Sequence, residues 1–91
     1  MAGADRPTIS YKATVAKDLS RLDRTAALRI VGKIERALGA SSDPGSPLKG
    51  EFEGLFRLRV GDDRVIFTRT AAGYLVLRVG HRREVYRKGR P

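Results

Sequence analysis

The most constraining feature of the sequence is a pair of alternating runs joined by Gly61 and Asp62. In residues 56–60, apolar side chains alternate with two arginines, and a second apolar run follows at 65–67. Alternation of this kind is the period of a β-strand with one packed face. A glycine that leads a two-residue connection suits a type II′ turn, whose first central residue has a positive φ. The sequence therefore predicts a β-hairpin here.

A third strand is predicted at 74–79, where apolar residues again occupy every second position. With one face of this sheet packed, we expect the other face to be cationic. Its arginines come from two paired strands: Arg57, Arg59 and Arg64. Like charges on adjacent strands destabilise a sheet, and the planar guanidinium grips phosphate with two parallel hydrogen bonds. The pattern favours a phosphate-bearing partner, and the alternative is a solvated strand face.

The N-terminal half carries helical as well as strand patterns. Residues 1–7 are small and polar and are interpreted as a flexible leader, and 8–91 as a single domain. A period of two at 8–13 predicts the first strand. Helical spacing then predicts a short helix over 16–22, with Thr14 as its N-cap.

A second, longer helix is predicted after Asp23, which can cap it. Its apolar stripe consists of Ala27, Ile30, Val31, Ile34 and Leu38. Gly39 lies where a C-terminal cap residue is expected, and residues 41–47 are dense in turn formers, which predicts a loop.

This order of elements predicts the fold class. A strand, two helices and three strands indicate an α+β domain, a largely antiparallel sheet with the two N-terminal helices packed on one face (β-α-α-β-β-β). We expect the first strand to insert beside the later hairpins through the helical crossover.

Composition narrows the function. The 91 residues carry 19 basic and 10 acidic side chains, a formal charge of +9, which predicts attraction to nucleic acid, anionic lipid or an acidic protein. Lipid fits least, because many arginines lie in strand-patterned sequence rather than opposite an apolar helical face. Cysteine is absent and there is one histidine, so no disulfide or thiolate metal site is possible and no metal centre is expected. Without a membrane span or secretory signal, we expect a cytoplasmic protein.

Three segments together resemble a known superfamily. They are the Leu48-Lys49-Gly50 segment, the hairpin at 55–67 and the ending Val-Gly-His-Arg-Arg-Glu-Val-Tyr at 79–86. In combination they are similar to toxins of the RelE/ParE superfamily from type II toxin–antitoxin pairs, over about residues 9–87. The resemblance implies the same α+β fold and a cognate antitoxin, which the charge predicts to be acidic.

The RelE-like branch of that superfamily cleaves messenger RNA in the ribosomal A site. The resemblance thus implies a metal-independent, ribosome-dependent endoribonuclease that inhibits translation and needs no cofactor. The catalytic positions it implies are Arg57, Arg59, Arg64, Arg82 and Tyr86. Contacts to RNA are expected from Lys49, Arg57, Arg59, Arg78 and Arg83. Tyr86 has three possible uses: stacking on a base, orienting the 2′-hydroxyl, or packing at the sheet edge.

The chain departs from the best-known members, which have lysines in place of Arg57 and Arg59, one of them often assigned as general base. An arginine, with a pKa of about 12 or higher, deprotonates very poorly. Two alternatives follow. Either His81 is the base, because histidine titrates near neutral pH, or it is a surface residue and the arginines act by stabilising charge and aligning the 2′-hydroxyl.

Two other functions stay open. A toxin of the ParE-like branch would inhibit DNA gyrase without cutting RNA, and a relative that had lost catalysis would only bind RNA. The arginines and Tyr86 favour the RelE-like branch, because a gyrase inhibitor need not keep an RNA-cutting set.

Overall fold

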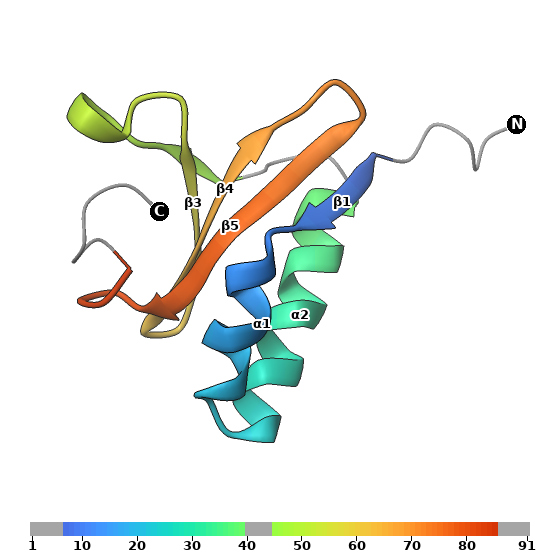
Figure 1. Cartoon of the computed structure of the whole chain (residues 1–91), viewed down its shortest axis with the longest axis vertical. Helices are drawn as coiled ribbons and strands as arrows, with labels where there is room; N and C mark the ends of the chain where they lie inside the picture. The colour runs from blue at the N-terminus through green and yellow to red at the C-terminus, as the bar shows by residue number, and fades with distance from the viewer. Residues whose placement is uncertain (1–6, 40–44, 86–91) are drawn as a thin grey trace, which may run out of the picture.

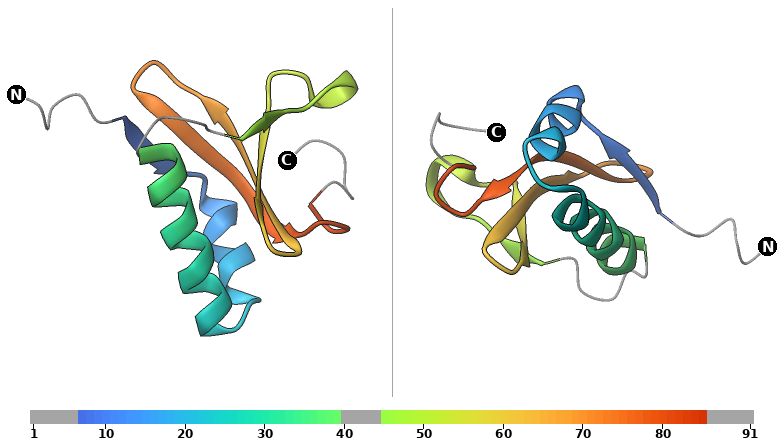
Figure 2. Two further views of the ribbon diagram at one scale, coloured as in Figure 1. Left: turned by 180° about the vertical axis from the view of Figure 1, so that it is seen from behind. Right: turned by 90° about the horizontal axis from the view of Figure 1, so that it is seen from below.

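The computed structural model describes residues 7–39 and 45–85, and within them the chain forms a mixed sheet with two helices on one face (Figures 1 and 2). The order of elements is β1 (Thr8–Tyr11), α1 (Ala13–Ser20), α2 (Arg24–Gly39), β2 (Ser46–Pro47), the 3-10 turn η2 (Gly50–Phe52), β3 (Phe56–Val60), β4 (Asp63–Arg69) and β5 (Gly73–His81). Across the sheet the strands lie in the order β1-β5-β4-β3-β2. The α+β class predicted from the sequence is confirmed.

The predicted hairpin is present as β3 and β4. Val60 pairs with Asp63, and Gly61 begins the two-residue turn with a φ of +63°. A side chain at Gly61 would be strained at that angle. The sheet is extended by β2, where Ser46 pairs with Arg57, although the sequence predicted only a loop there. Gly45 precedes it so close to β3 that a Cβ would collide with the Arg57 carbonyl.

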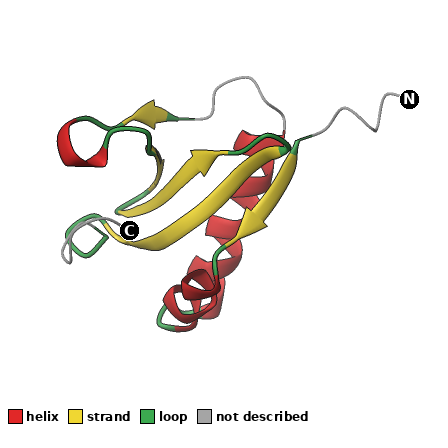
Figure 3. Ribbon diagram, turned by 45° about the horizontal axis from the view of Figure 1, so that its top comes forward, coloured by secondary structure: helices red, strands yellow, loops and turns green. Residues whose placement is uncertain are grey.

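The first strand enters the sheet as expected, parallel to β5 (Figure 3). It ends at Tyr11, and α1 begins at Ala13, three residues earlier than predicted. Thr14 lies inside this helix and does not cap it, because its hydroxyl donates to the Leu77 carbonyl of β5 at 3.1 Å. Helix α1 thus contacts the edge of β5 beyond the point where β1 stops pairing with it.

The predicted cap of the second helix is confirmed. The Asp23 carboxylate accepts from the Ala26 N–H at 2.7 Å, so α2 begins at Arg24. Its stripe faces the sheet, and Ile30, Ile34 and Leu38 are completely or almost completely buried. They pack against strand residues of the main core, which include Leu58, Val60, Val65, Phe67, Val76 and Val79. At about 25 cal/mol per Å², burial of such side chains supplies most of the stabilisation.

The face of the sheet away from the helices, hereafter the open face, is not simply cationic as predicted. It carries a second, smaller apolar cluster of Leu55, Ile66, Leu77 and Val85, with Leu48, Phe52 and Leu75 against it. Ile66 reaches the open face through its alternation with Val65 and Phe67, and Leu75 and Leu77 reach it through their alternation with Val76. A register shift at Ile66/Phe67, where β4 and β5 lose their strict pairing, brings Val79 into the main core together with Val76.

Candidate functional site

Two arginines of β3 define the centre of the open face. Arg57 and Arg59 alternate with Phe56, Leu58 and Val60, which pack on the helix side, so both arginines project from the opposite side. Arg57 is half-buried beside its cross-strand partner Ile66, and Arg59 is exposed. The predicted placement of these arginines on one face is confirmed.

A lateral row connects this centre to the end of β5. Arg59 pairs with Arg64 of β4, and Arg64 pairs with Gly80 of β5. Two arginines directly opposite each other would repel. They avoid this because Arg64, only 9% exposed, folds back onto its own turn.

The guanidinium of Arg64 closes the hairpin. Its Nη1 donates to the carbonyls of Gly61 at 2.9 Å and Asp63 at 3.0 Å. Both acceptors are backbone oxygens that the tight turn leaves exposed to a donor. Arg64 therefore stiffens the turn beside Arg59, and its Nη1 is used internally.

Arg57 is in the opposite situation. Its Nε is buried and has no hydrogen-bond partner among residues 7–39 and 45–85. A buried donor without a partner costs free energy, and native proteins rarely leave one. Arg57, unlike Arg64, is thus left with a donor that no described residue satisfies.

The chain after β5 folds into a single turn at the same end of the sheet as Arg64. The Arg82 N–H donates to the Asp62 carbonyl at 3.0 Å, and the His81 carbonyl accepts from the Glu84 and Val85 N–H groups at 2.7 and 3.1 Å. Val85, 2% exposed, fixes this turn in the open-face cluster. The backbone of Arg82 is thus held next to the hairpin turn, and its side chain is exposed.

His81 is exposed in this turn, and its ring is oriented by the backbone. Its Nδ1 accepts from the Arg83 N–H at 3.1 Å, which leaves Nε2 as the ring nitrogen that can donate. The lone pair that a general base needs is then already occupied. The geometry favours His81 as a donor rather than as a base.

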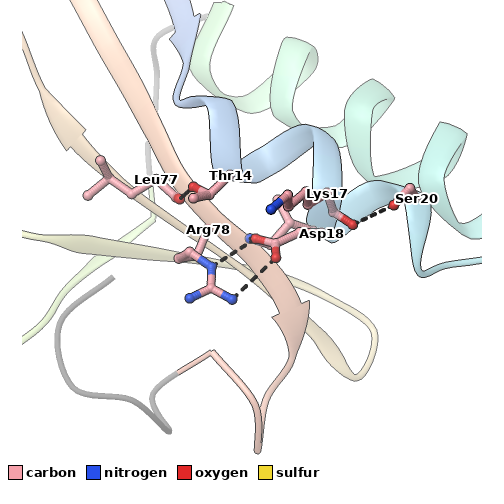
Figure 4. A network of polar contacts seen from close by, with 7 residues as sticks. Thr14, Lys17, Asp18, Ser20, Leu77 and Arg78 are labelled. Atoms are coloured by element: carbon pink, nitrogen blue, oxygen red, sulfur yellow. Dashed lines mark hydrogen bonds and ion pairs between the residues drawn. The ribbon is translucent and has the colours of Figure 1, made fainter.

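Arg78 does not join the open-face arginines. Its Nε and Nη2 donate to the Asp18 carboxylate at 2.9 and 3.2 Å, and the Val79 N–H donates to the same carboxylate at 2.9 Å (Figure 4). The hydrogen bond to Asp18 raises the pKa of Arg78, although partial burial opposes it, so this guanidinium stays charged at every working pH.

The remaining predicted residues lie further out. Lys49 is exposed at the start of η2, and Arg83 is exposed in the turn after β5. Tyr86 lies outside the described residues.

Asp18 is the polar residue that the sequence reasoning missed. It is 7% exposed, and together with Arg78 it forms the one ion pair found within the described part of the chain. The sequence could have indicated its burial, because Asp18 lies three residues after Val15 and one before Leu19, on the buried stripe of α1. A carboxylate on such a stripe requires a partner.

The described residues contain no cluster of three or more histidine, cysteine or acidic side chains that could hold a metal ion. In the same residues, no helix has both the length and the hydropathy needed to cross a membrane.

The sequence matches the family of ParE toxins of the type II toxin–antitoxin system parDE over residues 9–86. Because this match spans most of the chain, the protein belongs to that family and is a type II toxin of the RelE/ParE superfamily. The superfamily resemblance seen in the sequence is confirmed. No sequence among the curated proteins matches the chain.

Solved structures agree with this assignment. A chain of the toxin–antitoxin complex RelBE2 from Mycobacterium tuberculosis is 30% identical, with a TM-score of 0.69 over 85% of this chain and 92% of that one. A chain of the RelB–RelE complex from Methanococcus jannaschii is 24% identical, with a TM-score of 0.67 and coverage of 85% and 94%. YafQ from E. coli is 16% identical, with a TM-score of 0.63 and coverage of 89% and 99%. The last two likenesses show the fold alone.

Proposed function

We propose that this toxin is a metal-independent endoribonuclease of the RelE type that cleaves messenger RNA on the ribosome and is neutralised by an acidic antitoxin. The observation that carries the proposal is the set of arginines at the centre of the open face and in the turn after β5. Arg57, Arg59 and Arg82 form no ion pair within the described residues, and Arg57 has a buried donor without a partner. RNA phosphates are the acceptors that such a set fits.

The reaction can proceed with the RNA, solvent water and these side chains. The 2′-hydroxyl of the RNA loses its proton to solvent hydroxide and its oxygen attacks the adjacent phosphorus. The bond to the 5′-oxygen then breaks, and that oxygen takes a proton from solvent water. Arg57 and Arg59 stabilise the charge that develops on the phosphoryl oxygens, and Arg82 donates to the leaving oxygen. Removal of one pre-placed donor of this kind typically costs about 10²–10³-fold in rate.

Arg64 and Tyr86 have different parts in this proposal. Arg64 holds the hairpin turn, so it acts by positioning its neighbour Arg59. Tyr86, for which we rely on the resemblance, would stack on a splayed base or orient the 2′-hydroxyl. Lys49 and Arg83 are expected to contact RNA outside the reacting phosphate.

The antitoxin partner is supported by the RelBE2 structure, which is a toxin–antitoxin complex. The charge of +9 predicts that its binding segment is acidic. The affinity of the complex should then fall markedly between low and high salt, because screening weakens such contacts. An affinity that hardly changes with salt would contradict neutralisation of this kind.

A second candidate function is inhibition of DNA gyrase, and the family match to ParE toxins favours it. Inducible expression of the full chain, followed by mapping of messenger RNA 5′ ends, separates the two. Cuts inside translated codons that disappear when translation is blocked support the ribonuclease, whereas intact messages with supercoiling defects support the gyrase inhibitor. The Arg82→Ala variant at equal abundance is the control for site-specific cleavage.

A further inference from the structure

A pocket of about 520 Å³ lies between α1 and the C-terminal end of β5, outside the arginine set described above. Its basic lining consists of Lys17, Arg21, Arg78 and His81, and its acidic lining of Asp18 and Glu84. The three permanent cations exceed the two carboxylates by one charge. The pocket is large enough for a phosphodiester group together with its sugar.

The negative charge of the Asp18 carboxylate is balanced by the positive charge of Arg78, so Lys17 and Arg21 supply the excess positive charge of the pocket. Asp18 Oδ2 accepts from Arg78 Nε and Val79 N, and its Oδ1 accepts from Arg78 Nη2. These bonds also fix the guanidinium of Arg78 in one orientation, and Figure 4 shows it held beside α1. Its Nη1 makes no hydrogen bond within the described residues, so a charged donor is already oriented before any ligand arrives.

The neighbouring side chains add further donors. His81 uses Nδ1 to accept from the Arg83 N–H, so Nε2 is left to present an N–H to the pocket. Lys17 and Arg21 form no ion pair in the part of the chain that the structure describes. Several donors therefore line one pocket, which is the arrangement that binds an anion.

The pocket continues the lateral row of the open face. Arg59 pairs with Arg64, Arg64 pairs with Gly80, and Gly80 lines the pocket. Neighbouring strands are about 4.8 Å apart, so the backbone of Arg59 lies roughly 10 Å from that of Gly80. A single RNA strand can cover this distance along its backbone.

We propose that this pocket binds a backbone phosphate of the same RNA strand, adjacent to the phosphate held by Arg57 and Arg59. The inference rests on the proposed function for the identity of the strand. A phosphate rather than a peptide carboxylate is favoured because the pocket adjoins the arginine row and combines a fixed guanidinium with flanking cations. The site would set the direction in which the RNA crosses the sheet.

The sharpest test compares two arginines of equal charge. Arg21 lines the pocket, whereas Arg24 is exposed at the start of α2 and does not. With the full chain and a labelled 2′-O-methyl RNA oligonucleotide, which cannot be cleaved, Arg21→Gln should weaken binding about tenfold, and Arg24→Gln should leave it nearly unchanged. The slope of log affinity against log salt should become less negative by about 0.7 for Arg21→Gln only.

A second pair repeats the comparison with lysines: Lys17→Gln in the pocket against Lys12→Gln at the N-cap of α1. Titration of the native protein with inorganic phosphate should shift the amide signals of Lys17, Val79 and His81 first. Equal losses of RNA affinity within each pair would show that only net charge matters and would overturn the proposal. So would a variant that loses an acidic partner protein but keeps RNA binding.

The result is separable from the proposed function. If the native protein cuts no message on ribosomes but the pocket variants still bind RNA less well than their controls, the nuclease proposal fails and the pocket stands. If cleavage is present and the pocket variants bind and cleave RNA as the controls do, the pocket proposal fails and the nuclease stands.

Discussion

Arg78 and Arg57 are both strand arginines at alternating positions, yet the fold treats them in opposite ways. Arg78 on β5 is joined to Asp18 by two hydrogen bonds and remains 29% exposed. Arg57 on β3 has a buried Nε without a partner in the described residues. The difference comes from α1, which brings a carboxylate to β5, whereas no helix covers the face from which Arg57 projects.

This contrast distinguishes a charged residue that stabilises the fold, Arg78, from one that is available to a partner, Arg57. The chain has 19 basic residues, and its described part forms one ion pair, at the junction of α1 and β5. That pair also satisfies the Val79 N–H at a strand edge that β1 does not reach. Arg57 and Arg59 have no ion pair within the described residues, which is expected if their partner is another molecule.

The largest effect should follow from removing an arginine of the open face. Arg57→Ala and Arg82→Ala should each lower the rate of ribosome-dependent cleavage about 10²–10³-fold, because each removes a donor aimed at developing charge. Single-turnover cleavage on programmed ribosomes measures this. Arg69→Ala is the matched control, since Arg69 is an exposed arginine over the Phe56 ring at the far end of β4. Full toxicity of either variant at equal abundance would show that the site is misplaced.

Among substitutions of residues near the surface, Asp18→Ala should lower the free energy of unfolding most. It leaves the partly buried Arg78 and the Val79 N–H without their acceptor, and breaking a buried pair on one side costs about 3 kcal/mol. Urea denaturation measures the loss. Asp23→Ala, which removes only the cap of α2, should cost about 1 kcal/mol. Equal losses for the two aspartates would mean that the ion pair contributes little.

Helices and strands in which apolar residues recur at regular spacing could be predicted from the sequence. Irregularities in how the strands pair could not. The hairpin, the stripe of α2 and the Asp23 cap depend on local spacing, so they were predictable. The register shift at Ile66 depends on how β4 and β5 pair across the sheet, and no local pattern reveals it. For that reason the strand pattern alone did not indicate that Val76 and Val79 would both lie in the main core.

The candidate site divides in the same way. Alternation on β3 placed Arg57 and Arg59 together, and antiparallel pairing placed Arg64 near Arg82. The sequence did not indicate that Arg64 bonds to its own turn, because this depends on the positions of two carbonyls. Nor did it indicate that α1 would bring Asp18 to Arg78, a contact across 60 positions.

Arg64→Ala tests the division between positioning and catalysis on β4. It removes the bonds to the Gly61 and Asp63 carbonyls, so we expect unfolding to become easier by about 1–2 kcal/mol. Cleavage should fall less steeply than with Arg57→Ala, and antitoxin binding should persist. Arg64→Lys, which keeps one donor near the turn, should recover much of the stability. A loss of cleavage as large as that of Arg57→Ala, with unchanged stability, would instead place Arg64 at the reacting phosphate.

The smallest effect on the cleavage rate is expected from substitution of His81. The two hypotheses about the general base predict different pH dependences of that rate. If His81 were the base, His81→Ala would cost about 10²–10⁴-fold, and the native rate would rise through about pH 6–7 and then level off. We expect less than a tenfold loss, because Nδ1 is occupied by the Arg83 N–H and the ring only donates through Nε2. The rate should keep climbing with pH as the 2′-hydroxyl ionises, in the native protein and in the variant alike. His81→Asn, whose amide oxygen can replace Nδ1 as acceptor, separates loss of the turn from loss of the ring. A histidine-like inflection on programmed ribosomes that disappears in both variants would assign the proton transfer to His81.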